Sequence, residues 1–207
     1  MKTNVYVDAF NLYYGCLKGT PYRWLNIEAL CQAEFPANTI NRIRCFTARV
    51  SARPGDPDQR NRQNAYLRAL DTLPNLSIHY GQFRETEVRM RTVSPPPNTV
   101  LVKKTEEKGS DVNLASYLLL DGFRHDYEAA IVITNDSDLV EPIRIVRKEL
   151  GLKVVALIPC GPTGRPSIEI RRVASKSKII GLSNLPLCQF APTLTDANGT
   201  ITKPSTW

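Results

Sequence analysis

The sequence predicts an α/β fold with a central, mainly parallel sheet. Short apolar runs typical of buried strands alternate along the chain with longer segments of helical periodicity. Two of the runs, 129–134 and 153–159, are apolar almost throughout, as strands inside a parallel sheet usually are. Strands that alternate with helices in this way imply parallel β–α units.

The N-terminal segments fit this alternation. Residues 3–8 are predicted to form a buried strand, rich in Val and Tyr, that ends on Asp8. A helix is expected over 25–35, with Asn26 as its N-cap and a proline directly after it. The segment 40–50 alternates apolar residues with arginines and predicts a second strand.

The middle of the chain mixes loops with one clear helix. Its Pro, Gly and Asp content makes 51–59 a loop, and 59–73 has the apolar spacing of a helix. Residues 76–93 alternate like a strand, and we interpret them as a hairpin broken around 84–86. The prolines of 94–98 predict a stiff, exposed turn.

Further strands and helices follow this turn. A strand is expected over 99–104 and a helix over 110–123. After the first fully apolar strand, a helix is predicted over 138–150, with Asp138 and Glu141 in the spacing of a capping box.

The pattern weakens near the C-terminus, where Thr, Pro and Asn become common. We therefore predict one domain over residues 1–182 and a tail or peripheral extension over 183–207.

Composition narrows the classes of protein to consider. At 42% hydrophobic and 23% charged residues, the chain resembles an ordinary globular protein. No apolar run approaches the roughly 18 residues of a membrane span, and we read no secretory signal. Five scattered cysteines without a C-x-x-C spacing predict neither a zinc cluster nor a disulfide framework, so a cytoplasmic location is expected. The net charge of +7 favours a polyanionic partner, although a merely basic surface gives the same charge.

Four acidic residues are expected to meet at one edge of the sheet. Asp8, Asp136 and Asp138 follow predicted strands, and Asp111 begins a predicted helix. Each alone is explained as a cap or turn residue, but together they repel one another unless a cation offsets their charge. Oxygen ligands without nearby His or Cys favour Mg²⁺ or Mn²⁺ over zinc. With only two histidines in the chain, a histidine-driven ribonuclease is disfavoured.

Three ordered motifs carry a resemblance to a known family. The segments "VYVDAFNLYYG", "EEKGSDVNLASYLLLDGF" and "AAIVITNDSDLVEPIRIVRKELGLKVV" resemble the successive motifs of the NYN domain family, PIN-like nucleases that include LabA-type bacterial proteins. The resemblance covers roughly residues 3–160. It implies a PIN-like three-layer α/β/α sandwich and metal-dependent hydrolysis of RNA.

The resemblance also assigns roles to individual residues. Carried over to this sequence, it implies that Asp8 binds the metal and that Asn11 supports the metal or a substrate phosphate. Asp111 would supply a carboxylate from the start of its helix, and Asp136 and Asp138 would complete the site.

The chain departs from the family pattern at two places. Many relatives have another acid about two turns into the helix, where this chain has Ser116 and Tyr117, and Asp121 comes a turn later. The helix 59–73 also lacks the glutamate that PIN nucleases proper use, so the number of metals stays open.

Basic and aromatic residues near the predicted edge indicate a substrate surface. Arg49 and Arg53 follow the second strand. Lys108 precedes a helix start where a phosphate could bind, although Gly-Ser before Asp is also an ordinary helix entry. Tyr13 and Tyr14 are placed to stack a base, or equally to pack the first helix.

These observations lead to a functional hypothesis. We expect a metal-dependent endoribonuclease in which metal-activated water attacks the phosphodiester and leaves a 5′-phosphate. The alternative is a non-catalytic RNA-binding or regulatory module on the same fold. A haloacid-type phosphatase is disfavoured because Asp8 is followed by Ala-Phe and not by a second aspartate two residues on. A topoisomerase-primase-like site is disfavoured because it needs a glutamate where this chain has Asp8. RNA is the expected partner and a membrane is not, while the oligomeric state stays open, a homodimer included.

Overall fold

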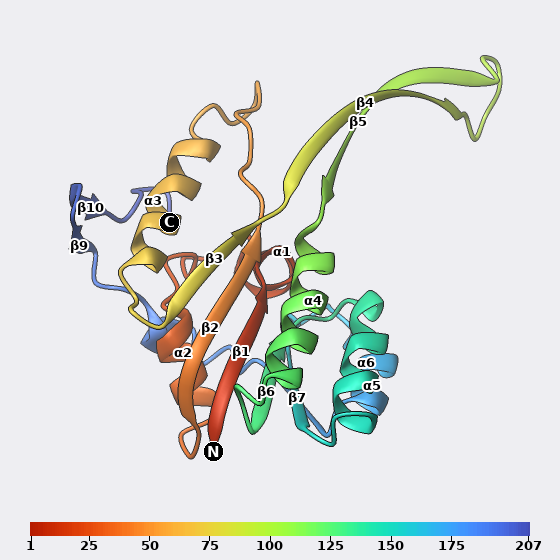
Figure 1. The fold of residues 1–207 in the computed structure, drawn as a ribbon. Coiled ribbons are helices and arrows are strands. Elements are labelled where there is room, and N and C mark those ends of the chain that lie inside the picture. The colour runs from red at the N-terminus through yellow and green to blue at the C-terminus, as the bar shows by residue number, and fades with distance from the viewer.

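A six-stranded, fully parallel sheet forms the centre of the protein, for which a computed structural model describes residues 1–207. The strand order is β3-β2-β1-β6-β7-β8 (Figure 1). The strands are β1 (Lys2–Asp8), β2 (Thr39–Thr47), β3 (Leu76–Tyr80), β6 (Ala129–Ile133), β7 (Lys153–Ile158) and β8 (Lys176–Ile179). The chain order reverses between β1 and β6, and in open α/β sheets such a point is the usual place of a ligand site.

Helices cover both faces of the sheet (Figure 1). They are α1 (Ala9–Leu12), which continues into a π-helical turn (Tyr13–Leu17), α2 (Ile27–Glu34), α3 (Gln59–Asp71), α4 (Ser110–Phe123), α5 (Val140–Lys148) and α6 (Ile168–Val173). Successive residues of β1 point to opposite faces, so Val5 and Val7 join the core beneath α2 and α3, while Tyr6 joins the core beneath α4 and α5. The predicted three-layer α/β/α sandwich is confirmed.

A long antiparallel ribbon projects from the sandwich (Figure 1). It consists of β4 (Gln82–Arg91) and β5 (Thr99–Lys108), and we call it the arm. The predicted break at 84–86 is wrong, because these residues pair within β4 and the chain breaks at Gly81 instead. A Cβ at Gly81 would lie 2.7 Å from the backbone carbonyl oxygen of Lys108 and 2.9 Å from the backbone nitrogen of Ser110, so only glycine fits where the two chain segments cross at the base of the arm.

The entry into α5 also differs from the prediction. A short 3₁₀ turn, η2 (Ser137–Leu139), precedes the helix, and the Asp136 carboxylate caps it by accepting a hydrogen bond from the amide of Asp138 at 3.0 Å. The predicted capping box of Asp138 and Glu141 is therefore absent, and Glu141 pairs with Arg144 at 2.6 Å instead.

Residues 183–207 pack along α2 and α3. They contain a 3₁₀ turn, η3 (Pro186–Cys188), and a hairpin of β9 (Thr193–Asp196) and β10 (Gly199–Thr202). Asp196 receives two hydrogen bonds from Arg68 of α3, at 2.9 and 2.7 Å. Trp207 contacts the rings of Trp24 and Tyr66, so the end of this segment packs against the core near α3 (Figure 1).

None of the helices combines the length and the apolar character needed to cross a bilayer.

Candidate metal centre

Asp8 lies at the carboxyl end of β1 and is only 4% exposed. Its two oxygens accept hydrogen bonds from the backbone amide of Asn11 at 3.0 Å, the side-chain amide of Asn11 at 2.8 Å and the hydroxyl of Thr134 at 3.1 Å. The backbone amide belongs to the first turn of α1, so Asp8 also caps that helix. These contacts hold the carboxylate in one orientation at the point where the strand order reverses.

Two further carboxylates approach Asp8 from separate elements. Asp136 follows β6, and its own amide is held by the Thr134 hydroxyl at 3.0 Å. Asp111 lies in the first turn of α4, directly after the left-handed Gly109, whose φ of 99° lets the chain turn from β5 into the helix. One carboxylate oxygen each from Asp8, Asp111 and Asp136 lies within 4.8 Å of the other two.

Burial and the closeness of the carboxylates raise the pKa values of Asp8 and Asp111. The pKa of Asp111 is raised to about 6, first by burial and then by the charges of the nearby carboxylates of Asp8 and Asp136. Burial also raises the pKa of Asp8, and the charge of Asp136 adds to the rise, while the hydrogen bonds of Asn11 and Thr134 oppose it. A divalent cation among these oxygens would offset the repulsion.

The three carboxylates line an open cavity of about 350 Å³, which we call the acidic pocket. Asn11, Phe83 of the arm, Thr105 and Glu107 also line it, and Arg53 is the only cationic side chain that does so. No histidine or cysteine borders this pocket. The donors are therefore oxygen atoms, which suits Mg²⁺ or Mn²⁺ better than zinc.

The structure brings together only part of the predicted site. Asp138 is exposed and lies outside the three-carboxylate group, although its charge contributes to the raised pKa of Asp111. Lys108 pairs with Glu106 at 3.3 Å and does not line the acidic pocket. Arg49 also lies outside the pocket lining and donates to Asn64 at 3.0 Å.

Asp121 does not replace the acid that this chain lacks. It is 2% exposed, it accepts two hydrogen bonds from Arg44 at 2.8 and 3.0 Å, and it accepts a third from the Tyr6 hydroxyl at 2.8 Å. This network lies beneath α4, in the core on the far side of the sheet from α3. The Asp121 carboxylate therefore has a structural role.

Several residues that line the acidic pocket were missed by sequence reasoning. At the start of α4, Glu107 accepts hydrogen bonds from the Ser110 amide at 3.2 Å and from the Ser110 hydroxyl at 2.6 Å. Thr134, which lies just behind the pocket lining, contacts both Asp8 and the amide of Asp136. Thr134 directly precedes the N-D-S-D segment, so its position after a buried strand is a signal that could have found it. Gln59 and Phe83 carry no such signal, because folding alone brings α3 and the arm to this edge.

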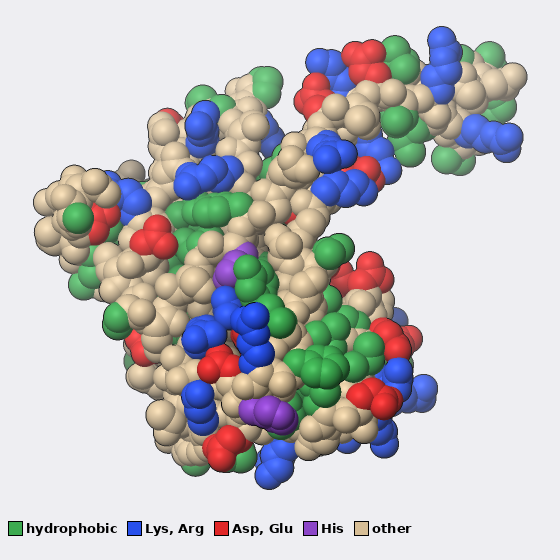
Figure 2. Space-filling view, viewed as in Figure 1, with side chains coloured by type: hydrophobic (Ala, Val, Ile, Leu, Met, Phe, Trp, Pro, Cys, Tyr) green, Lys and Arg blue, Asp and Glu red, His purple; other side chains and the backbone are tan.

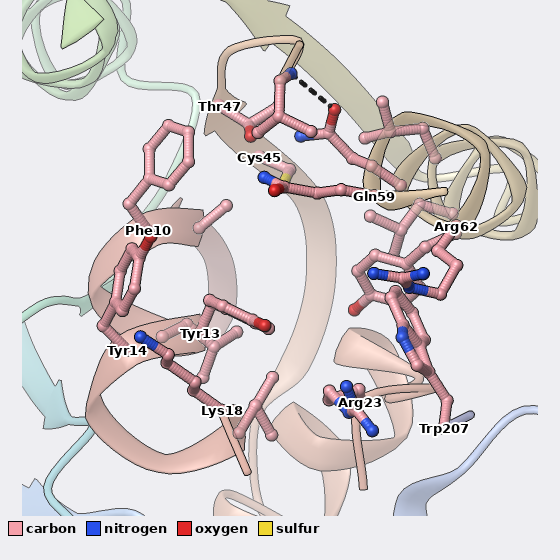
Figure 3. A pocket seen from close by; sticks show the side chains of 18 of the residues that line it. Phe10, Tyr13, Tyr14, Lys18, Arg23, Cys45, Thr47, Gln59, Arg62 and Trp207 are labelled. Atoms are coloured by element: carbon pink, nitrogen blue, oxygen red, sulfur yellow. Dashed lines mark hydrogen bonds between the residues drawn. The ribbon is translucent and has the colours of Figure 1, made fainter. Parts of the chain in front are cut away.

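A second cavity of about 460 Å³ adjoins the acidic pocket (Figure 3), and we call it the aromatic cavity. Residues shared by the two linings mark where they meet: Phe10, Tyr14, Val50, Arg53 and Gln59. Of the two predicted stacking residues, Tyr13 lines only the aromatic cavity, whereas Tyr14 borders both and is 57% exposed.

Comparisons with known proteins agree with this architecture. A family model described as the NYN domain matches residues 2–179. The 6-hydroxy-3-succinoylpyridine 3-monooxygenase of Pseudomonas putida is 26% identical over an alignment that covers 100% of this chain and 75% of that protein. A crystal structure of a protein of unknown function from Vibrio parahaemolyticus superposes with a TM-score of 0.55 at 12% identity, covering 87% of this chain and 93% of the other. The last similarity concerns the fold alone.

Proposed function

Since this chain belongs to the NYN domain family, a family of nuclease domains, we propose that it is a metal-dependent ribonuclease. It cuts RNA internally and leaves 5′-phosphate ends. The observation that carries the proposal is the convergence of oxygens from Asp8, Asp111 and Asp136 within 4.8 Å at the reversal of strand order.

The donor set fits a hard divalent cation. Three carboxylates from three elements supply oxygen ligands only, and the pKa values of Asp8 and Asp111 are raised first by burial and further by the charge of neighbouring carboxylates. Mg²⁺ and Mn²⁺ both accept such ligands and keep part of their water shell.

The residues around the pocket have separable roles in this proposal. Asp8, Asp111 and Asp136 would hold the cation, which when bound lowers the pKa of a water ligand and offsets charge on the phosphate oxygens. Asn11 fixes the orientation of Asp8 through two hydrogen bonds. Arg53, the one cation bordering the pocket, is placed to pair with a phosphate of the RNA.

The basic character of the arm supports RNA as the substrate class. Its outer part, residues 88–105, carries four basic residues and no acid. Figure 2 shows basic side chains along the length of the arm, which begins at the acidic pocket through Phe83 and Thr105. Phosphate neutralisation by such residues dominates nucleic-acid affinity.

Cleavage of single-stranded RNA with Mg²⁺ or Mn²⁺ tests the proposal. We expect cleavage that a chelator abolishes, products with 5′-phosphates, and loss of activity in Asp8→Asn and Asp136→Asn. Glu149→Gln, which neutralises an exposed acid at the end of α5, is the matched control and should retain activity. Full activity in both Asp variants would refute the site assignment. Tight RNA binding without turnover in the wild type would instead support the non-catalytic module.

A second candidate function comes from the Pseudomonas relative, whose name describes a monooxygenase acting on a substituted pyridine. The aromatic cavity favours it, because a space of about 460 Å³ with aromatic walls is able to hold a small ring compound. Oxygen uptake by the purified protein on adding 6-hydroxy-3-succinoylpyridine and an electron donor would support this function, and its absence alongside RNA cleavage would exclude it.

A further inference from the structure

We propose that the aromatic cavity binds one unpaired base of the RNA strand whose phosphodiester lies at the three carboxylates. The inference rests on the proposed ribonuclease function and names its substrate as single-stranded RNA. It follows from the walls of the cavity, from its unpaired polar and cationic groups, and from its connection to the acidic pocket.

The walls of the cavity suit a flat ring. Its volume of about 460 Å³ falls within the range of roughly 300–1,000 Å³ that is usual for ligand pockets. The aliphatic part of its lining comes from Leu12, Leu17, Ile27, Leu67 and Leu70. Tyr13, Tyr66 and Trp207 add aromatic surfaces, and bases stack on such rings with little regard to sequence.

One wall depends on the C-terminal segment. The Trp207 ring lies 5.9 Å from the ring of Tyr66 and 6.3 Å from that of Trp24, and the Arg23 guanidinium lies over it at 5.5 Å. These contacts fix Trp207 at the cavity, although it lies beyond residue 179, where the match to the family model ends. The wall is therefore an addition to the part of the chain that the family model describes.

Two polar groups point into the cavity without a partner (Figure 3). The side chains of Gln59 and Tyr13 both reach into the space, and no hydrogen bond joins either polar end to the protein. By contrast, the neighbouring Gln63 is engaged by the backbone at Val50 and Ala48, at 2.9 and 2.8 Å. A free carboxamide offers a donor and an acceptor side by side, which is what the edge of a base requires.

Charge indicates an anionic occupant. Lys18, Arg23 and Arg53 border the cavity, and none of the three pairs with a carboxylate, whereas Arg62 is neutralised by Asp56. Lys18 lies over the ring of Tyr14 at 4.9 Å, and Tyr14 borders both pockets. An aromatic ring attached to a phosphate matches both the walls and the cations.

The connection between the two pockets sets the arrangement of the substrate. Because Phe10, Tyr14, Val50, Arg53 and Gln59 line both, a ligand can occupy both pockets without crossing a barrier. A base in the aromatic cavity would then place its sugar-phosphate beside Arg53 and the carboxylates. Only an unpaired base can enter such a cavity, so the inference predicts cleavage of single strands over duplexes.

The test measures nucleotide binding without metal, so that it is independent of turnover. In a chelator, uridine and adenosine 5′-monophosphates should quench the fluorescence of Trp207, and Trp207→Phe should lose most of the signal. Ribose 5-phosphate, which lacks a base, should bind about 5- to 150-fold more weakly, because stacking contributes on the order of 1–3 kcal/mol per base. Tyr13→Ala and Gln59→Ala should weaken nucleotide binding, and Tyr13→Phe, which keeps the ring but removes the hydroxyl, should weaken it less than Tyr13→Ala.

Four outcomes would overturn the inference. Equal binding of ribose 5-phosphate and the nucleotides would leave charge alone as the cause. Tighter binding of pyridine-3-carboxylate than of either nucleotide would assign the cavity to a small aromatic acid. RNA cleavage without detectable nucleotide binding, or unchanged binding in Tyr13→Ala and Gln59→Ala, would also contradict it while leaving the ribonuclease proposal intact. Nucleotide binding without RNA cleavage would support the cavity assignment and count against the ribonuclease.

Discussion

Asp111 lies in the first turn of α4, where the positive end of the helix dipole favours a carboxylate, yet its pKa is raised to about 6. Burial and the nearby acids outweigh the dipole. The protein thus keeps a negative charge in a place where folding alone would prefer a neutral side chain, which is typical of residues retained for function rather than stability.

This charge predicts a stabilising substitution. The carboxyl of Asp111 has a higher pKa in the folded than in the unfolded chain, so its ionised form destabilises the fold above about pH 6 and the cost disappears below about pH 4. We expect Asp111→Asn to raise the free energy of unfolding by about 1 kcal/mol near neutral pH, after allowing for solvent screening of a partly exposed group. Urea denaturation in a chelator, at about pH 7.5 and about pH 4, would check it. A gain of equal size at both pH values would contradict the electrostatic explanation.

The same pKa predicts how metal binding depends on pH. Since a protonated carboxyl is a poor ligand, the affinity for Mn²⁺ should fall as the pH drops through about 6. In titration calorimetry, Asp8→Asn should weaken Mn²⁺ binding on the order of 100-fold, while Asp138→Asn, outside the three-carboxylate group, should change it only slightly. A large loss in Asp138→Asn would restore that residue as a ligand.

Neutralising Asp121 should lower the stability of the fold, whereas neutralising Asp111 should raise it. Its neutralisation leaves the Arg44 guanidinium without its buried partner, so Asp121→Asn should lower the free energy of unfolding by about 3 kcal/mol. Mn²⁺ affinity of the remaining folded protein should stay unchanged. If Mn²⁺ binding were lost before stability, the structural role assigned to Asp121 would be wrong.

The position of a residue at the site was predictable from the sequence where the neighbouring residues show which element it follows. Asp8 and Asp136 each follow a strand whose apolar run is visible, so the carboxyl-end rule for parallel sheets places them together. Gln59 and Trp207 reach the neighbouring cavity through contacts between segments far apart in the chain, and no local pattern encodes these. Asp138 was grouped with Asp136 by spacing, but the 3₁₀ turn after Asp136 separates the two side chains.

Among the elements, the arm combines an apolar face with a basic one. Cross-strand partners share a face, so Val88, Met90, Val100 and Val102 lie together on one side of its outer half. Arg89 and Arg91 lie on the other side, and neither forms an ion pair. The alternation was visible in the sequence, but the length of the arm was not, because the break depends on the crowding at Gly81.

The arm yields a prediction about salt dependence. If Arg89 and Arg91 contact RNA phosphates, Arg89→Gln with Arg91→Gln should lower the slope of log affinity against log salt by about 1.4 for single-stranded RNA. Arg124→Gln with Lys153→Gln removes equal charge near the amino ends of the strands, opposite the acidic pocket, and should leave the slope almost unchanged. Fluorescence anisotropy at several salt concentrations would measure both slopes. Equal effects of the two pairs would mean that the arm arginines act only through the net charge of the protein and do not contact RNA phosphates.

Across the whole molecule, the excess of basic residues contrasts with a local cluster of carboxylates at one edge of the sheet. The chain carries a net charge of +7, but the edge of the sheet where the strand order reverses gathers three carboxylates. A polyanion is attracted by the overall charge and repelled by this edge unless a cation occupies it. Metal binding and RNA binding should therefore reinforce each other.

Diffraction from crystals soaked in Mn²⁺ would show whether the three carboxylates hold the ion. We expect an anomalous peak among the carboxylates of Asp8, Asp111 and Asp136 in the wild type, and its loss in Asp136→Asn crystals. A wild-type protein that cleaves RNA with Mn²⁺, yet shows no peak among these three carboxylates or binds the ion elsewhere, would contradict this expectation.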